Sequence, residues 1–333
     1  MEKITLSHGG GGTLMHRLID SLIVKEFDNA ILRRKKDSAI FEIGKTPVAF
    51  TTDSYVVNPI FFPGGDIGSL AVYGTVNDLC VCGARPLYIS LGLIIEEGLD
   101  GAILDRIVKS AASAARRAGI RIVTGDTKVV EKGSCDKIFV NTSGIGEIYY
   151  DKLEIDSIKP GDAVIISGTI GEHAISVLSA REGIEFSTKV KSDSAPLDRL
   201  IRKALLGRGA VKFMRDPTRG GVATTLNEIV SLRRFGISLD EAVIPVSDGV
   251  RQACELLGFD PLYLACEGRA IFVTGKKYAD IVLGAIRKDA GGKKAAIIGE
   301  VTNDYRGKVC LSTISGGKRM VDMLSGEQLP RIC

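Results

Sequence analysis

The chain has 333 residues, of which 45% are hydrophobic and 25% are charged, so it is long enough to form two domains that each bury a core. This composition excludes an intrinsically disordered chain, and a formal net charge of +4 without a long basic block gives little support for nucleic-acid binding. No apolar run has the length of a membrane span and no signal peptide is visible, so we expect a soluble, cytoplasmic protein without a membrane anchor.

The seven cysteines are odd in number and are scattered along the chain. This pattern predicts reduced thiols in a reducing compartment rather than a framework of disulfides. One of them, Cys333, is the last residue and stands apart from the others.

A run of glycines at residues 9–12 precedes apolar residues with helical spacing over residues 14–23, so we expect the first helix directly after a glycine loop. Strand and helix patterns then alternate as far as residue 145. They predict strands at 39–43, 48–52, 88–95, 121–124 and 138–145, and helices at 68–82 and 104–118.

A polar segment at residues 151–162, which ends in a Pro-Gly-Asp turn, predicts a domain boundary. Beyond it the pattern predicts strands at 163–167 and 270–274, a helix from residue 172, and helices at 221–233 and 278–288. Because both halves mix strands with helices, we expect an α/β or α+β fold in which helices cover sheets.

The common nucleotide-binding signatures do not fit this sequence. Residues 44–46 end like a P-loop, but Ala39 stands where its leading glycine is required, and Leu14 breaks the Rossmann fingerprint. The three histidines lack the ligand spacing of a zinc site. A bound nucleotide would therefore be held in another way.

Three aspartates are candidates for a magnesium site, namely Asp53, Asp78 and Asp126. We expect each of them at the end of a strand or helix, where Mg²⁺ would bridge the mutually repelling carboxylates to phosphates. The ordinary alternative for each aspartate is a surface turn or a helix cap.

Two backbone segments are candidates for phosphate contacts. Residues 9–12 offer consecutive N–H groups before a helix, which suits a phosphate lid, although a disordered N-terminal arm has the same composition. Residues 215–221, Arg-Asp-Pro-Thr-Arg-Gly-Gly, bring Asp216 to the start of another helix. A capped helix start explains that segment nearly as well.

Together these segments resemble a known family. The glycine-rich start, the segments 52–54, 77–79, 125–128 and 216–221, and the ending Leu-Pro-Arg-Ile-Cys are similar to those of HypE, within the superfamily of aminoimidazole ribonucleotide synthetases. The likeness covers essentially the whole chain. The internal segments are typical of the superfamily, and the Pro-Arg-Ile-Cys ending is typical of HypE.

The resemblance implies a two-domain PurM-like fold, in which each domain is a mixed sheet covered by helices, and a homodimer whose N-terminal sheets pair into a barrel. It divides the chain into a glycine-rich lid with the first helix (1–37), an ATP-binding and dimerisation domain (38–155), a C-terminal domain (156–325) and a flexible tail (326–333).

The resemblance also implies a site for ATP and Mg²⁺ in a cleft between the domains. By position, Asp53, Asp78 and Asp126 would hold magnesium and phosphate. The other nucleotide-binding candidates are Gly10, Gly11, Gly12, Thr127 and Asp216. Lys128 and Glu267 match the pair that the family uses to remove protons, and Cys333 carries the substrate group.

The implied function is ATP-dependent dehydration of a carbamoyl group on Cys333 to a thiocyanate, which supplies a cyanide ligand for the iron centre of [NiFe]-hydrogenases. The implied partners are a HypF-like carbamoyltransferase and a HypC–HypD complex that accepts the cyanide. Glu267 is the better base, because a lysine such as Lys128 is protonated at neutral pH unless burial lowers its pKa. Lys128 would then stabilise the transferring phosphate, and an ordinary ion pair is the simpler role for the two residues.

Two other functions fit parts of the pattern. A selenophosphate synthetase-like enzyme shares the aspartates and the segment 216–221, but it has a cysteine or selenocysteine and a lysine near the glycine run, where this chain has His8. A non-catalytic thiol carrier would use Cys333 to shuttle a ligand, and its nucleotide site would only switch the position of the tail.

Overall fold

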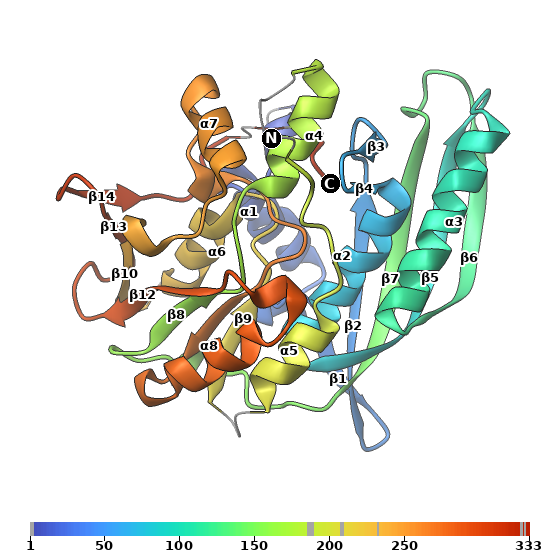
Figure 1. Ribbon diagram of the computed structural model, residues 1–333. Helices are drawn as coiled ribbons and strands as arrows, with labels where there is room; N and C mark the ends of the chain where they lie inside the picture. The colour runs from blue at the N-terminus through green and yellow to red at the C-terminus, as the bar shows by residue number, and fades with distance from the viewer. Residues whose placement is uncertain (1–2, 185–189, 207–209, 232, 327–328, 330) are drawn as a thin grey trace.

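The structure is a computed structural model of the chain, which describes residues 3–184, 190–206, 210–231, 233–326, 329 and 331–333. Among these residues the strands form two large mixed sheets and a short ladder, and helices cover the sheets (Figure 1). The predicted class, mixed sheets covered by helices, is therefore confirmed. No helix within the described ranges is both long and apolar enough to cross a membrane.

The N-terminal sheet has the strand order β1-β2-β7-β5-β6, in which β5 and β6 run parallel and the other neighbours run antiparallel. Its strands are β1 (Ala39–Ile43), β2 (Thr46–Tyr55), β5 (Ala84–Glu96), β6 (Arg121–Val130) and β7 (Ile138–Ile148). The short strands β3 (Phe61–Phe62) and β4 (Gly65–Asp66) lead from this sheet into the first long helix.

Helices α2 (Ile67–Val81) and α3 (Gly101–Ala118) cover one face of the N-terminal sheet (Figure 1). Helix α2 begins where the Asp66 carboxylate accepts hydrogen bonds from the N–H groups of Gly68 and Ser69. Almost all of its residues are buried, as expected for a helix that is apolar all round.

The C-terminal sheet has the strand order β14-β13-β10-β12-β8-β11-β9. Its strands are β8 (Ala163–Ile166), β9 (Val211–Arg215), β10 (Gly236–Asp240), β11 (Ile271–Thr274), β12 (Ala296–Thr302), β13 (Val309–Ser312) and β14 (Lys318–Val321). The accompanying helices are α4 (Glu172–Glu182), α5 (Asp198–Leu205), α6 (Gly221–Val230), α7 (Asp248–Leu257) and α8 (Ala279–Arg287).

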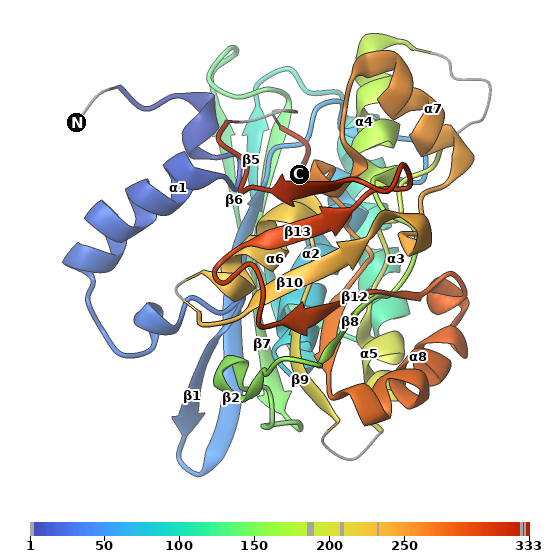
Figure 2. The ribbon, with the colours of Figure 1, turned by 90° about the vertical axis from the view of Figure 1, so that its left-hand side faces the viewer.

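The N-terminal arm consists of α1 (Thr13–Leu18), which continues as the π-helix η2 (Ile19–Val24) and projects from the rest of the chain (Figure 2). The remaining short elements are 3₁₀-helices: η1 (Leu6–His8), η3 (Leu32–Arg34), η4 (Ile155–Ser157), η5 (Glu241–Val243), η6 (Pro261–Tyr263), η7 (Lys276–Tyr278) and η8 (Ala290–Gly292).

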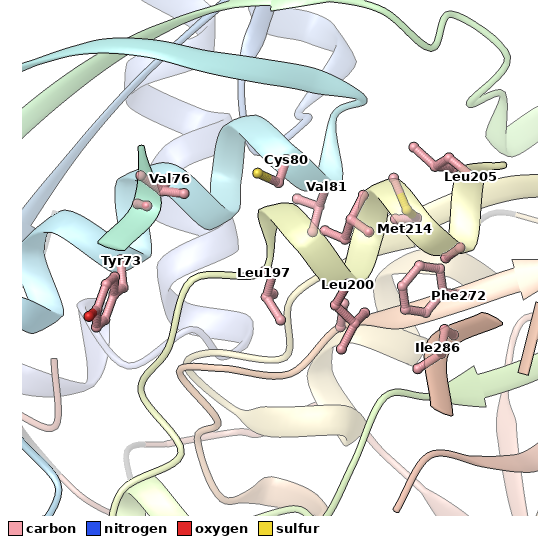
Figure 3. Close-up of a cluster of buried hydrophobic side chains, with 14 of the residues drawn as sticks. Tyr73, Val76, Cys80, Val81, Leu197, Leu200, Leu205, Met214, Phe272 and Ile286 are labelled. Atoms are coloured by element: carbon pink, nitrogen blue, oxygen red, sulfur yellow. The ribbon is translucent and has the colours of Figure 1, made fainter. Parts of the chain in front are cut away.

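One hydrophobic core joins the two halves of the chain. Val76 and Cys80 of α2 pack in the same buried cluster as Leu200 of α5 and Phe272 of β11, and Figure 3 shows these side chains between the helices. Because a close-packed interior resists small shifts, this core fixes α2 against the C-terminal half. That matters for the site, because α2 carries Asp78.

Candidate active site

Three aspartates from different parts of the chain converge next to α2. Asp37 precedes β1, Asp78 lies within α2 and Asp216 follows β9, and one carboxylate oxygen of each lies within 4.8 Å of those of the other two. The Thr51 hydroxyl donates to Asp78 at 2.9 Å, and Arg215 forms an ion pair of 2.8 Å with Asp37. The cluster thus combines a set of acids with little positive charge to offset them.

Burial changes the proton affinity of these acids. Burial raises the pKa of Asp78 well above its ordinary value, and the charges of Asp216 and Asp37 raise it further. Burial and the charge of Asp37 raise the pKa of Asp216 to about 7. Because the three carboxylates repel one another at this distance, they are not easily ionised at the same time. A cation bound between them would stabilise the ionised cluster.

A cavity of about 230 Å³ opens at the cluster. Its walls include Asp53 from β2 and Glu267 from the segment before β11, together with all three clustered aspartates. Cys333 and Gly11 also line it. The structure therefore brings together six of the residues that the sequence singled out, namely Gly11, Asp53, Asp78, Asp216, Glu267 and Cys333.

Glu267, which the sequence analysis identified as the candidate base, is a deeply buried acid in the wall of this cavity. Its side chain is 3% exposed, and its Oε1 has no hydrogen-bond partner among the described residues. Burial raises the pKa of Glu267 well above its ordinary value, and the charges of Asp216 and Asp53 add to this effect. Burial thus favours the protonated form of Glu267 relative to that of an exposed glutamate.

The glycine run packs against the segment that contains Asp216. Gly11 has a φ of +77°, and a Cβ at this position would lie 2.9 Å from the carbonyl oxygen of Arg219. A Cβ at Gly12 would lie 2.3 Å from the carbonyl oxygen of Leu324. Gly10 lines a separate cavity of about 30 Å³. Only glycine, which has no side chain, allows the backbones to come this close. The glycine run thereby forms one side of the larger cavity, which Gly11 lines.

Arg219 is the cation at this junction. Its Nη1 donates to the carbonyl oxygen of Gly9 at 3.2 Å, and its Nη2 lies 3.8 Å from an Asp53 oxygen. The negative charge of Cys333 is the largest influence on Arg219 and raises its pKa. The Arg219 side chain thus interacts with the glycine run, with Asp53 of the cavity and with the last residue of the chain.

Asp126, Thr127 and Lys128 lie outside this cavity. They are exposed on β6, where the Lys128 ammonium pairs with Asp126 at 2.7 Å and lowers the pKa of that carboxylate through a hydrogen bond. The register of β6 pairs Asp126 with Gly92 and Lys128 with Ile94, on the face of the sheet that points away from α2.

Three expectations about local structure were wrong. Asp53 does not end a strand, because β2 continues to Tyr55. Asp78 does not end an element, because it lies inside α2, which continues to Val81. Asp126 does not follow a strand, because β6 pairs in parallel with β5 as far as Val130 and so includes it. The alternation of apolar residues is weak over 125–130, since this edge strand is exposed along most of its length.

The sequence did not single out Asp37, although it belongs to the cluster. It stands between a basic stretch and a strand, which is an ordinary place for a loop aspartate. Asp37 forms an ion pair with Arg215, which begins the candidate segment 215–221. That pairing is not visible in the sequence.

The donor set fits Mg²⁺ and a polyphosphate. Mg²⁺ prefers oxygen ligands, and Asp37, Asp78 and Asp216 offer carboxylate oxygens close enough to share one ion. The unpartnered Oε1 of Glu267 in the same cavity adds a buried polar atom that awaits a ligand or a proton partner.

Comparison with known families agrees with this architecture. Residues 35–148 match the N-terminal domain of AIR synthase related proteins, and residues 159–311 match the C-terminal domain. The chain therefore has the two-part fold of that class of protein.

Full-length relatives narrow the class. The chain is 51% identical to the carbamoyl dehydratase HypE of Cupriavidus necator over 99% of this chain and 95% of the relative. It is 49% identical to a crystal structure of HypE in complex with ATP, with a TM-score of 0.83 over 99% of this chain and all of the other. A HypE–HypF complex has a TM-score of 0.87 at 48% identity, over 92% and 99% of the two chains. The chain belongs to the HypE family.

Proposed function

We propose that this chain is an ATP-dependent carbamoyl dehydratase that converts an S-carbamoyl group on its own Cys333 into a thiocyanate. The observation that carries the proposal is that Cys333 shares one cavity with Glu267 and the acids Asp53, Asp78 and Asp216. Its relatives of 50% and 51% identity are carbamoyl dehydratases, and a relative of 49% identity binds ATP.

The acidic residues that line the cavity would form the nucleotide site. Asp37, Asp78 and Asp216 would hold Mg²⁺, which would neutralise the charge of the phosphates when bound. Asp53 lines the same cavity, and one of its oxygens lies 3.8 Å from Nη2 of Arg219. The backbone of the glycine run, with Gly11 at the cavity, would cover the phosphates as a lid.

The chemistry requires activation of a poor leaving group. The carbonyl oxygen of the carbamoyl group attacks the γ-phosphorus of ATP, so an O–P bond forms and ADP leaves. Loss of one N–H proton gives an S-linked imidoyl phosphate. Loss of the second proton, with breakage of the C–O bond, forms the C≡N bond and releases inorganic phosphate. The sum removes one water from the carbamoyl group.

Glu267 is the base for these protons in our proposal. Glu267 lines the cavity, and its buried Oε1 has no hydrogen-bond partner in the described part of the chain. Burial raises the pKa of Glu267 and so brings it nearer to the range in which a carboxylate accepts a proton well. A cation bound to the neighbouring aspartates would favour the ionised form of Glu267 and so prepare it to act.

We further propose that the functional unit is a homodimer in which the N-terminal sheets pair into a barrel. Phe50, Ile145 and Tyr88 form a row across β2, β7 and β5 on the outer face of the sheet, and Phe50 and Tyr88 are 42% and 45% exposed. An exposed apolar row on a sheet suits burial against another apolar surface. Lys128 and Asp126 share this face, so they would reach an active site only in the partner subunit.

The partners and compartment follow from the family. A HypF-like carbamoyltransferase would load Cys333, since a relative of 48% identity forms a HypE–HypF complex. A HypC–HypD complex would accept the cyanide for the iron centre of a [NiFe]-hydrogenase in the cytoplasm. The ranges 1–37, 38–155, 156–325 and 326–333 remain our proposal for lid, two domains and tail.

Intact-mass analysis tests the function. The chain is incubated with a HypF-like carbamoyltransferase and carbamoyl phosphate, and ATP and Mg²⁺ are then added in a second step. We expect a carbamoyl adduct that loses the mass of one water only when ATP is present. Cys333→Ala should show neither adduct and should still bind ATP. An adduct that never loses water while ATP is bound would favour a thiol carrier instead.

A further inference from the structure

The last three residues pair with the segment that follows β2. The N–H of Val56 donates to the carbonyl oxygen of Cys333 at 3.1 Å, and the N–H of Asn58 donates to that of Arg331 at 3.2 Å. The chain end thus lies antiparallel beside residues 56–58, and Arg331 has a φ of +54°, outside the extended region. Ile332 is 6% exposed and belongs to the buried cluster that contains Tyr55 and Val57, while Cys333 lines the cavity.

A buried histidine holds the carbonyl group next to Cys333. His173 of α4 is fully buried, with Nε2 at 2.8 Å from the carbonyl oxygen of Ile332 and Nδ1 at 2.8 Å from the Ser192 hydroxyl. A carbonyl oxygen only accepts, so the network assigns the ring proton to Nε2 and makes Nδ1 the acceptor from Ser192. Burial lowers the pKa of His173, although Asp193 opposes this, so the ring stays neutral.

Charged side chains fix the register of the same segment. Arg331 donates from Nε to the carbonyl oxygen of Val56 at 3.0 Å and from Nη1 to Asp136 at 2.8 Å. Arg181 donates to the carbonyl oxygens of Asn58 and Arg331 at 2.7 and 2.8 Å. A slip by one residue would break both backbone hydrogen bonds and move Ile332 out of its buried cluster, so these contacts select one register.

We propose that residues 56–58, Asp136, His173 and Arg181 form a docking site for the C-terminal segment of the chain, in which His173 and Asp136 are positioning residues for Cys333. The ligand is a chain end with a basic, an aliphatic and a thiol residue in that order. The purpose that we assign to the docking site, which is to place Cys333 for dehydration, rests on the proposed function. The contacts that form the docking site do not depend on that function.

The rate at which iodoacetamide alkylates Cys333 reports on docking without any need for activity. The remaining cysteines give a low background because they are buried: Cys80, Cys82, Cys135, Cys254, Cys266 and Cys310. Intact mass counts the adducts, and peptide mapping locates them. In the wild-type chain we expect Cys333 to react several times more slowly than the same residue in a free Leu-Pro-Arg-Ile-Cys peptide.

His173→Leu removes the donor to the Ile332 carbonyl and should raise the alkylation rate about 2- to 10-fold, the effect of one hydrogen bond of typical net strength. His173→Gln keeps an N–H donor on a side chain of similar length and should restore much of the protection. Asp136→Ala acts at a half-exposed position, so it cannot fail through the core, and should raise the rate about 1.5- to 5-fold.

Asp105→Ala is the matched control, because it removes an exposed ion pair, to Lys109, that does not touch the tail. Its alkylation rate should equal that of the wild type. Wild-type alkylation as fast as in the free peptide, or unchanged protection in both His173→Leu and Asp136→Ala, would refute the docking site.

A catalytic measurement separates positioning from general damage to the fold. In carbamoylated His173→Leu, the maximal rate of water loss should fall while the ATP concentration for half-maximal rate stays unchanged, and His173→Gln should recover most of it. If the wild type protects Cys333 but never loses water with ATP, the proposed function fails and the docking site stands.

Discussion

The side-chain amide of Asn77 donates a hydrogen bond of 3.1 Å to the backbone carbonyl oxygen of Glu267. The same amide group donates to Ala195 at 3.1 Å, and its oxygen accepts from the N–H of Leu197 at 2.9 Å. Asn77 is 1% exposed and precedes Asp78 on α2. One helix therefore positions both an acid of the nucleotide site and the backbone of the candidate base.

Asn77→Asp should uncouple these two parts. The substitution keeps the shape but replaces the donor with an acceptor that faces two carbonyl oxygens, so the free energy of unfolding should fall by about 1–3 kcal/mol. The maximal rate of water loss from the carbamoylated tail should fall more than ATP affinity, because Glu267 is displaced. Thermal melting and single-turnover mass spectrometry measure the two effects.

Asn227→Asp is the matched control for that variant. Asn227 of α6 also donates to two backbone carbonyl oxygens, those of Ala223 and Val321, both at 2.8 Å. It should cost similar stability but leave the rate of water loss in the folded protein unchanged. An equal loss of rate in both variants would show that Asn77 acts through stability alone.

Glu267→Gln tests the base itself. The substitution keeps the size and one oxygen of the side chain but cannot take up the amide protons, so water loss should slow by about 10²–10⁴-fold. Carbamoylation by the partner enzyme should continue, and carbamoylated chain should accumulate in the mass spectrum. Because burial raises the pKa of Glu267, the wild-type rate should rise with pH until this group is ionised. A wild-type rate in Glu267→Gln would move the base elsewhere.

The buried acid Asp216 predicts how stability depends on pH in the absence of divalent cations. Its pKa rises from 3.8 to about 7 on folding, first through burial and then through the charge of Asp37. The folded chain therefore holds a proton between these pH values that the unfolded chain has lost. The stability that this proton provides is complete below pH of about 4 and is lost as pH rises through about 7, on the order of a few kcal/mol.

Thermal melting in EDTA between pH 4 and 8 measures this effect. Asp216→Asn should flatten the fall in melting temperature, because the amide does not titrate. Added Mg²⁺ should raise the melting temperature of the wild type at pH 8 more than that of Asp216→Asn, since binding to the folded state stabilises it. An equal pH profile in both chains would exclude Asp216 as the titrating group.

Much of the fold was predictable because the two sheets and their helices have clear apolar periodicity. Strand β1 was predicted at residues 39–43, where it lies, and α4 was predicted to begin at Glu172. The site was predictable where a local motif carried it, as for Asp53 and Asp216. Glu267 was identified through the family resemblance, and its burial without a partner is visible only in the structure.

The rest depends on contacts between distant residues. Asp37 meets Arg215 across 178 positions, and His173 meets Ile332 across 159, and neither pair leaves a periodic or spaced signal in the sequence. The tail was expected to be flexible, and the described residues 331–333 show its docked position. Whether the tail also leaves this position stays a prediction.

Lys128 and Glu267 should act on one substrate from two different subunits. Within one chain Lys128 lies on the outer face of the N-terminal sheet, outside the cavity that holds Glu267 and Cys333. If the sheets pair in a homodimer, Lys128 of one subunit would serve the cavity of the other. Lys128→Met should therefore slow water loss without preventing carbamoylation, because it removes a charge that stabilises the transferring phosphate.

Mixed dimers give the decisive measurement. Lys128→Met chains and Glu267→Gln chains are co-expressed with different tags, and the heterodimer is isolated through both. In an active site shared between subunits, the cavity of the Lys128→Met chain has its own Glu267 and the partner's intact lysine, whereas the other cavity lacks both groups. Thiocyanate should then form on the tail of the Lys128→Met chain alone, at close to the wild-type rate per site. If both groups must come from the same chain, neither tail in the heterodimer will lose water faster than in the two parent homodimers, and Lys128 is excluded as a residue supplied by the partner.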